Sequence, residues 1–294
     1  MARSVPVGGV GIAFGPRGME LLTHRDKVGQ GVGLDVEWIR RELSGGAHAL
    51  RSDPLVRAVG GPGPLPEGWG PNGLPLVPRP LGSPTHFHPE PGIPDAEVNA
   101  IIAARPLIVD ATAGFCNDAF HLAAVGYRVL AFERNGAIST VTWFNATGLL
   151  KDPLVGWAAR SVTMRDGDSR RELLRLSEAP DVVVLDPMFP PKRRRSALPP
   201  KPIQVLRLLA GDDEDAAELL AVARKVATRR VVVKRSDDAP PLGDLWPDWS
   251  VQGKTVRYDV YAAPGARAEA PPSEVGETDD GTPARGPGDK GPTA

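Results

Sequence analysis

Short apolar strand patterns alternate with helix patterns between residues 107 and 262, and this alternation constrains the fold more than any other feature. The most regular strand pattern is DVVVLD at residues 181–186, an apolar run typical of a parallel strand covered on both faces. Strands that alternate with helices form right-handed βαβ units, so we expect an α/β domain with an open, doubly wound, mostly parallel sheet. Further strands are predicted at 107–111, 128–133, 161–166, 229–235 and 255–262, and helices at 118–126, 137–150, 170–177 and 212–228.

Proline and glycine divide the chain around this block. The sequence holds 33 Gly and 32 Pro, and residues 61–95 carry a proline every few positions, which disfavours regular secondary structure. Beyond residue 263 the single large aliphatic side chain is Val275, too little apolar area to support a fold. We therefore predict an N-terminal subdomain over residues 1–60, a Pro-rich linker over 61–95, the main domain over 96–263 and a disordered tail over 264–294.

The composition excludes several classes of protein. The formal net charge is −1, so any nucleic-acid binding must use a local basic patch. Cys116 is the single cysteine, which excludes an intramolecular disulfide and a multi-cysteine metal site, and the five histidines lack metal-ligand spacing. No run approaches the roughly 18 apolar residues of a membrane span. We expect a cytoplasmic protein that contains no metal and does not cross a membrane.

A glycine turn follows the first strand of the block and is typical of a small-ligand site. Asp110 ends the strand, Gly114 permits a tight turn, and Asn117 and Asp118 stand at the start of the next helix, where backbone amides are free. Ligands of open α/β sheets bind at the carboxyl ends of the strands. The turn has one glycine instead of G-x-G-x-x-G, which disfavours a dinucleotide.

The end of the next strand adds a ribose-binding pattern. Glu133 lies where a carboxylate accepts hydrogen bonds from both hydroxyls of a ribose, and Arg134 is beside it. Together with the glycine turn this predicts a ribose-bearing ligand without pyrophosphate. The alternative is that Asp110 and Glu133 are solvated strand ends and the glycine turn is an ordinary one.

The segment DPMFP, residues 186–190, favours chemistry on a planar exocyclic amine. The Asp186 carboxylate and a backbone carbonyl accept the amino hydrogens and favour a pyramidal, nucleophilic nitrogen. Phe189 stacks on the ring, an interaction of about 1 to 3 kcal/mol per base. We assign Asp186, Pro187 and Phe189 to a catalytic loop. The alternative is a Pro-rich turn with Phe189 in the core.

Basic side chains follow this loop and end the next strand, at the ligand edge of the sheet. They are Lys192, Arg193, Arg194, Arg195, Lys234 and Arg235. Their placement predicts contacts with phosphates. A solvated face is the alternative for the loop, and pairing with Asp237 and Asp238 is the alternative for Lys234 and Arg235.

Six segments in this order resemble the RsmJ family of small-subunit ribosomal RNA guanine-N2 methyltransferases. They are VDATAGFCNDAF (109–120), FERN (132–135), DGDS (166–169), LDPMFPPK (185–192), RRVVVKRSDDAPPL (229–242) and VRYDVY (256–261). The family usually has leucine, glycine and arginine where this chain has Phe115, Cys116 and Asn117.

The resemblance implies a Rossmann-like class I fold whose seven-stranded sheet has an antiparallel final strand. It also implies S-adenosylmethionine as cofactor and small-subunit ribosomal RNA, free or within the 30S subunit, as partner. The residues that would surround the cofactor are Asn117, Asp118, Glu133, Arg134, Asp168 and Ser169, with Asp186 lining the active site. The basic residues would then contact the RNA backbone.

Two other classes of function remain open at this point. One is a methyltransferase of a different amine, such as adenine N6 or a small molecule. The other is a non-catalytic RNA-binding module that has kept the fold. Methylation of free nucleosides or small molecules in the absence of RNA favours the first, and failure to bind the cofactor favours the second.

Overall fold

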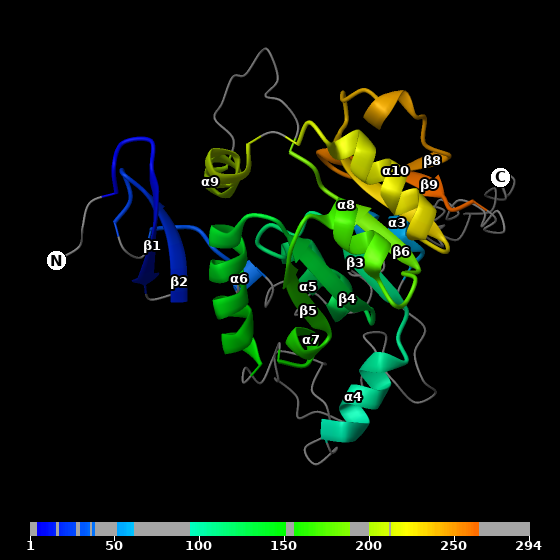
Figure 1. Cartoon of the computed structure of the whole chain (residues 1–294), viewed down its shortest axis with the longest axis horizontal. Helices are drawn as coiled ribbons and strands as arrows, with labels where there is room; N and C mark the ends of the chain where they lie inside the picture. The colour runs from blue at the N-terminus through cyan, green and yellow to red at the C-terminus, as the bar shows by residue number, and fades with distance from the viewer. Residues whose placement is uncertain are drawn as a thin grey trace, which may run out of the picture.

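The computed structural model describes residues 5–15, 18–27, 30–35, 37–38, 52–61, 95–150, 156–188, 200–211 and 213–264. Phe189, the basic loop from Lys192 to Arg195, nearly all of the predicted linker and the tail beyond Pro264 lie outside these residues. Figure 1 shows a central sheet with helices on both faces and a separate hairpin near the N-terminus.

Seven strands of the described residues form the main sheet, in the order β5-β4-β3-β6-β7-β9-β8. They are β3 (Leu107–Asp110), β4 (Arg128–Glu133), β5 (Val162–Asp166), β6 (Val182–Leu185), β7 (Arg230–Ser236), β8 (Trp249–Gln252) and β9 (Val256–Ala262). Neighbours from β5 through to β7 are parallel, whereas β9 is antiparallel to both β7 and β8. The predicted doubly wound sheet with an antiparallel final strand is confirmed, and its order reverses between β3 and β6.

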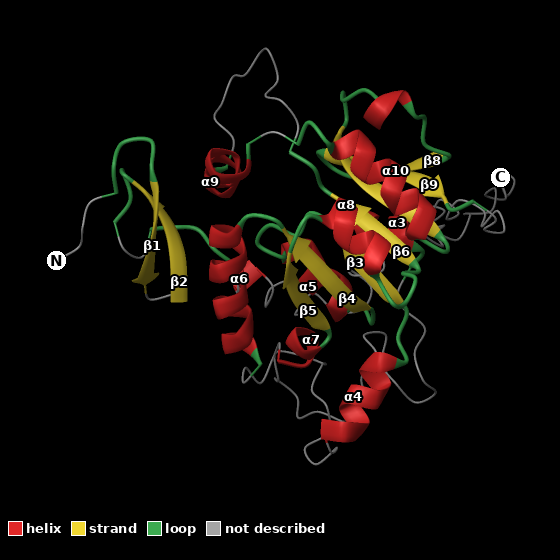
Figure 2. Cartoon of the chain, viewed as in Figure 1, coloured by secondary structure: helices red, strands yellow, loops and turns green. Residues whose placement is uncertain are grey.

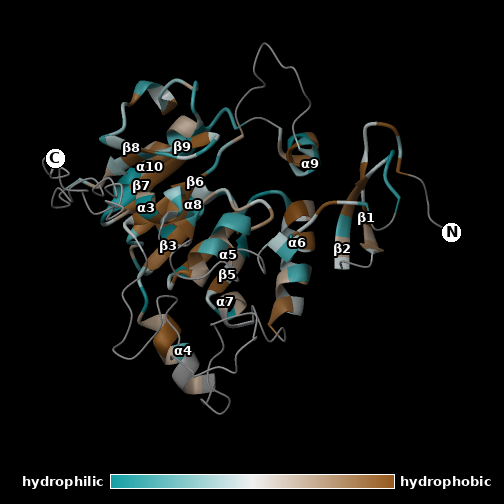
Figure 3. Cartoon of the chain, turned by 180° about the vertical axis from the view of Figure 1, so that it is seen from behind, coloured by the Kyte–Doolittle hydropathy of each residue, from teal (hydrophilic) through white to brown (hydrophobic). Residues whose placement is uncertain are grey.

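Helices cover both faces of the sheet, which explains the unbroken apolar strand patterns (Figure 2). One layer contains α3 (Pro54–Val59), α5 (Asn117–Ala124) and α7 (Gly156–Arg160), which pack with Val182 and Val184 of β6. The other contains the 3-10 turn η1 (Leu173–Arg175) and α10 (Ala216–Val226), which pack with Val183 and Leu185, and the short helix α8 (Ser169–Glu172), which contacts α10. Alternate residues of one strand therefore enter opposite cores, and hydrophobic residues concentrate between the layers (Figure 3).

The N-terminal hairpin docks beside the sheet domain instead of joining it. Strands β1 (Val10–Gly15) and β2 (Gly18–Thr23) pair with each other, and β2 packs against α6 (Gly136–Leu149). The Asn145 side chain donates to the carbonyl of Met19 (2.8 Å) and accepts from its N–H (2.9 Å). Gly18 has φ +100°, and a Cβ there would lie 2.5 Å from the Asn145 oxygen, so the hairpin turn requires glycine.

Three further helices complete the described chain, and several elements depart from the predicted pattern. Helices α4 (Asp95–Ala103) and α9 (Lys201–Ala210), the turn η2 (Leu242–Asp244), α3 and β8 were not predicted. The helix predicted at 170–177 is the short α8 followed by η1, and the one predicted at 212–228 begins at Ala216. Among the described residues, no helix has both the length and the apolar character needed to cross a membrane.

Candidate active site

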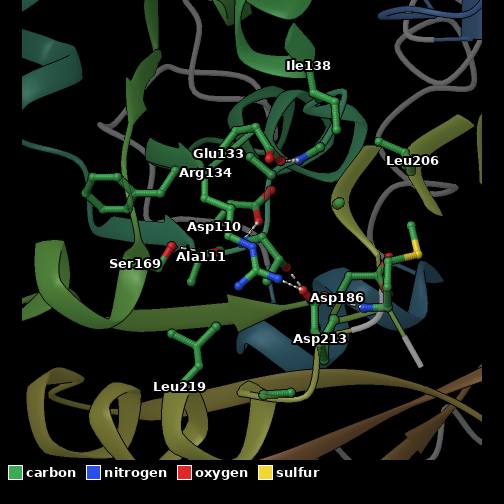
Figure 4. Close-up of a pocket in the computed structure, with 18 of the residues that line it drawn as sticks. Asp110, Ala111, Glu133, Arg134, Ile138, Ser169, Asp186, Leu206, Asp213 and Leu219 are labelled. Carbon is green, nitrogen blue, oxygen red and sulfur yellow. Dashed lines mark hydrogen bonds and ion pairs between the residues drawn. The ribbon is translucent and has the colours of Figure 1, made fainter. Parts of the chain in front are cut away.

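A cavity of about 270 Å³ opens at the carboxyl ends of β3, β4, β6 and β7, beside the point where strand order reverses (Figure 4). The predicted site residues that line it are Asp110, Gly114, Asn117, Asp118, Glu133, Arg134, Asp168, Ser169, Asp186, Pro187 and Lys234. The fold therefore brings together segments up to 124 residues apart in sequence, between Asp110 and Lys234.

The glycine turn is pinned to β4 by backbone contacts. Gly114, at φ +52°, donates its N–H to Glu133 Oε2 at 2.9 Å, and Ala113 donates to the carbonyl of Phe132 at 3.0 Å. Cys116 is fully buried in the core below the turn, where burial raises the pKa of its thiol well above the usual value. Asn117 Oδ1 is buried and has no hydrogen-bond partner among the described residues. An unpaired acceptor that lines a cavity is suited to a ligand donor.

Glu133 is held rigidly and retains unused acceptor capacity. It is 8% exposed, and its Oε1 accepts the N–H of Asn135 at 2.7 Å while Oε2 accepts that of Gly114. Burial raises the pKa of this carboxyl, and the two backbone hydrogen bonds oppose the rise. A carboxylate has about four acceptor positions, so two remain for hydroxyl donors.

Arg134 lines the cavity, but its guanidinium is engaged by carboxylates of the segment before α10. Its Nη1 contacts Asp215 at 2.8 Å, and its Nη2 contacts Asp213 (Figure 4). Asp168 is similarly engaged, since it caps α8 and pairs with Arg170 at 2.6 Å, which holds its pKa below the usual value. Arg134 and Asp168 therefore line the cavity and also form ion pairs with neighbouring side chains.

Asp213 also holds the predicted catalytic loop, a role that sequence reasoning missed. The Asp213 N–H donates to the carbonyl of Met188 at 3.0 Å, and the Met188 N–H donates to Asp213 Oδ2 at 2.5 Å. The two residues are 25 positions apart, and no local pattern links them. Asp213 therefore joins the loop after β6 to Arg134 at the end of β4.

Asp186 begins the loop after β6 and faces β7. Its N–H donates to Thr112 Oγ1 at 2.6 Å, and its Oδ2 lies 3.0 Å from Lys234 Nζ. Its side chain is 47% exposed, and the residue lines the cavity. Partial loss of hydration among the clustered side chains raises the pKa of the Asp186 carboxyl, and Lys234 opposes the rise. Burial and the neighbouring Asp118 raise the pKa of Asp110 to about 8.

Lys234 and Arg235 have surroundings that correct the expected basic surface patch. Lys234 is 23% exposed and pairs with Asp118 and Asp186 inside the cavity, away from the alternative partners Asp237 and Asp238. Arg235 is 4% exposed and donates to the carbonyl of Pro240. Strand register explains this, because successive residues of β7 face opposite layers and both layers are covered.

The residues that line the cavity suit a ligand that carries a ribose and a positive charge. The ionisable lining residues are seven carboxyl groups and three cations, namely Asp110, Asp118, Glu133, Asp168, Asp186, Asp213 and Asp215 with Arg134, Arg170 and Lys234. Phe132, Ile138, Leu206 and Leu219 add apolar walls suited to a flat ring. Within the described residues, no cluster of three or more His, Cys, Asp or Glu side chains is arranged to hold a metal ion.

Comparisons with known proteins agree with this chemistry. The sequence model of a family described as "Putative SAM-dependent methyltransferase" matches residues 96–263. The ribosomal RNA small subunit methyltransferase J of Edwardsiella ictaluri is 43% identical over 158 residues, 53% of this chain and 63% of that protein. The protein of the same name from Thioalkalivibrio sulfidiphilus is 38% identical over 215 residues, 72% of this chain and 69% of that one.

The coverage of these relatives differs. The match spans less than two thirds of the Edwardsiella protein and slightly more than two thirds of the Thioalkalivibrio protein. Among solved structures, a SAM-dependent methyltransferase from Neisseria gonorrhoeae aligns with a TM-score of 0.60 at 23% identity, over 91% of this chain and 88% of that one. That likeness concerns the fold.

Proposed function

Because the chain belongs to the RsmJ family of S-adenosylmethionine-dependent methyltransferases, we propose that it methylates the exocyclic N2 amine of a guanine in small-subunit ribosomal RNA. The observation that carries the proposal is a single cavity in which Asp186, suited to an amine, faces the same space as Glu133, suited to a ribose. The curated relatives are named for ribosomal RNA methylation, which supports RNA as the substrate class.

Residues at the ends of β3 and β4 would hold the cofactor. When bound, S-adenosylmethionine supplies an electrophilic methyl group on a sulfonium. Glu133 would accept the ribose hydroxyls with its free acceptor positions, and Asn117 Oδ1 would accept a ligand donor. The excess of carboxyl groups around the cavity complements the positive charge of the cofactor.

Residues at the ends of β6 and β7 would hold the amine. Asp186 accepts an amino hydrogen, directs the nitrogen lone pair toward the methyl group and takes the proton that the nitrogen releases. Pro187 and Met188 line the cavity beside it. Phe189 and the basic residues Lys192, Arg193, Arg194 and Arg195 lie outside the described residues, so stacking and RNA-backbone contact remain sequence-based predictions for them.

The protein's contribution is mainly orientation and exclusion of water, because a sulfonium methyl group needs little activation. A guanine within folded RNA must also be flipped out, at a cost of a few kcal/mol in lost stacking. Binding of the RNA backbone by the loop after Phe189 would offset this cost. The proposed substrate is this RNA either free or within the assembled 30S subunit, and the experiment below compares the two.

Labelled methyl transfer tests the proposal. Purified protein and S-adenosylmethionine are incubated with free small-subunit RNA and with 30S subunits, both from cells that lack the gene, and in a separate reaction with free nucleosides. We expect label on one guanine, located by nuclease digestion and mass spectrometry as N2-methylguanine. Label on adenine, or on free nucleosides alone, would replace the proposal with methylation of another amine. Cofactor binding without any transfer to RNA would contradict RNA as the substrate.

A further inference from the structure

Lys234 occupies the centre of a carboxylate cluster formed by three separate elements. Its Nζ lies 2.8 Å from Asp118 Oδ2 on α5 and 3.0 Å from Asp186 Oδ2 after β6. Asp110, at the end of β3, interacts electrostatically with the same group. The register of the sheet explains the meeting, since Leu185 of β6 pairs with Val233 of β7 and each neighbour follows by one residue.

The charge balance of this cluster differs from that of an ordinary ion pair. Burial disfavours the ammonium form of Lys234, but Asp186 and Asp118 outweigh burial and keep its pKa well above the usual value. One ammonium group therefore faces two carboxylates at hydrogen-bond distance, and a third carboxyl, Asp110, is also close. The ammonium of Lys234 is thus directed at these carboxylates within the cavity.

We propose that Lys234 is a positioning residue for Asp186, which it keeps ionised and oriented toward the amine of the substrate. The inference rests on the proposed methyl transfer. The chemical requirement is specific, because a protonated Asp186 cannot accept the proton that the amine loses as its nitrogen bonds to the methyl carbon. The electrons of the broken sulfur–carbon bond remain on sulfur, the amine proton passes to Asp186, and Lys234 stays protonated throughout.

The charged groups that face Asp186 act on its ionisation in opposite directions. Asp118 on α5 and Asp213 before α10 repel a second negative charge, and Lys234 attracts it. Tyr258 on β9 interacts with both Lys234 and Asp118, and burial raises the pKa of its phenol well above the usual value, so the phenol stays neutral. Removal of the ammonium leaves like charges close together, which favours the protonated form of Asp186.

The test compares pH profiles of single-turnover methyl transfer for Lys234→Met and the wild type. An opposite charge at this distance shifts a carboxyl pKa by about 1 to 3 units, so the acid limb of the Lys234→Met profile should move upward by a similar amount. Activity lost at pH 7 should return in part at alkaline pH. Lys234→Arg, which keeps the charge, should stay close to the wild-type profile.

Two further variants separate this role from a structural one. Lys225→Met removes an exposed lysine of α10 and changes the net charge equally, so its acid limb should not move. Asp118→Asn removes a repelling charge while Lys234 remains, so its acid limb should move to lower pH. The opposite signs expected for Asp118→Asn and Lys234→Met keep the test decisive even where one variant folds poorly.

The outcomes distinguish this inference from the proposed function. Uniform loss of activity at every pH in Lys234→Met, together with an unmoved acid limb in Asp118→Asn, would overturn the positioning role and leave Lys234 as part of the fold. A wild-type protein that methylates no guanine would instead overturn the proposed function, before any variant is compared.

Discussion

The two ends of the cavity balance their charges in different ways. At the β4–β5 end, Arg134 and Arg170 supply two guanidinium groups to Asp168, Asp213 and Asp215, and their side chains are 38% and 28% exposed. At the β6–β7 end, one less exposed ammonium, that of Lys234, faces Asp118 and Asp186. Two guanidinium groups offer more charge and more donors to the first end than one ammonium offers to the second. The β6–β7 end should therefore be the more sensitive to pH and to single substitutions.

The largest effect is expected from Asp186→Asn. The amide cannot accept the amine proton, and general-base contributions are typically about 10² to 10⁴ in rate. We expect kcat for methyl transfer to decrease by a factor of about 10² to 10⁴, while cofactor affinity, measured by calorimetry, changes by less than about tenfold. Near wild-type turnover would show that Asp186 does not accept the amine proton. The ion pair between Lys234 and Asp186 would then have no part in catalysis.

At the β4–β5 end, Glu133→Gln should weaken cofactor binding more than it slows methyl transfer, the reverse of Asp186→Asn. The neutral amide loses charge-assisted hydrogen bonds to the ribose and to the glycine turn, each worth about 1.5 to 3 kcal/mol. We expect the dissociation constant for S-adenosylmethionine to rise by about 10- to 100-fold and saturated turnover to fall much less. Loss of turnover at saturating cofactor, with affinity intact, would contradict the assignment of Glu133 to the ribose.

Asp213 connects the two ends, and Asp215 provides a matched control. Both carboxylates contact Arg134, but the Asp213 carboxylate also accepts the N–H of Met188 in the catalytic loop, whereas the Asp215 carboxylate contacts Arg170. We expect Asp213→Ala to lower kcat by about tenfold through misplacement of the loop, whereas Asp215→Ala should remain within about threefold of the wild type. Equal effects in the two variants would mean that only the ion pairs with Arg134 matter.

The sequence predicted the sheet better than the partners within the site. Strands with unbroken apolar runs, such as β6, were identified because burial on both faces leaves a strong local signal. Helix α9 was missed, although it lines the cavity through Leu206, because its amphipathic pattern follows a Pro-rich stretch. The Met188–Asp213 pairing depends on tertiary packing across 25 residues, which periodicity does not report.

The position of Lys234 depends on the register between two strands, which their separate sequences do not reveal. Residues 182–185 and 230–233 are adjacent parallel strands, and their alignment places Asp186 beside Lys234. The sequence alone gave the strands but not their adjacency, so Lys234 was grouped with the surface basic residues. Arg235, one position on, was assigned to the same patch for the same reason and is buried.

Asp110 is expected to affect stability and not catalysis, and it sharpens the contrast between the two ends. Its pKa is raised to about 8 in the folded protein by burial and by Asp118, whereas an unfolded Asp ionises near pH 3.9. Stability from this group is therefore fully present below about pH 4 and is lost as pH rises toward 8. Asp110→Asn removes that dependence and keeps an acceptor for the N–H of Thr112.

Thermal unfolding between pH 5 and 9 measures the difference. The melting temperature of Asp110→Asn relative to the wild type should increase with pH and level off above pH 8. The expected gain is about 10 °C, since each pH unit in this interval is worth about 1.4 kcal/mol and 1 kcal/mol corresponds to about 2 to 4 °C in a domain of this size. Asp168→Asn should show no such gain, because Arg170 holds the pKa of Asp168 below its usual value. Parallel behaviour of the two variants would mean that the ends of the cavity are equally well balanced.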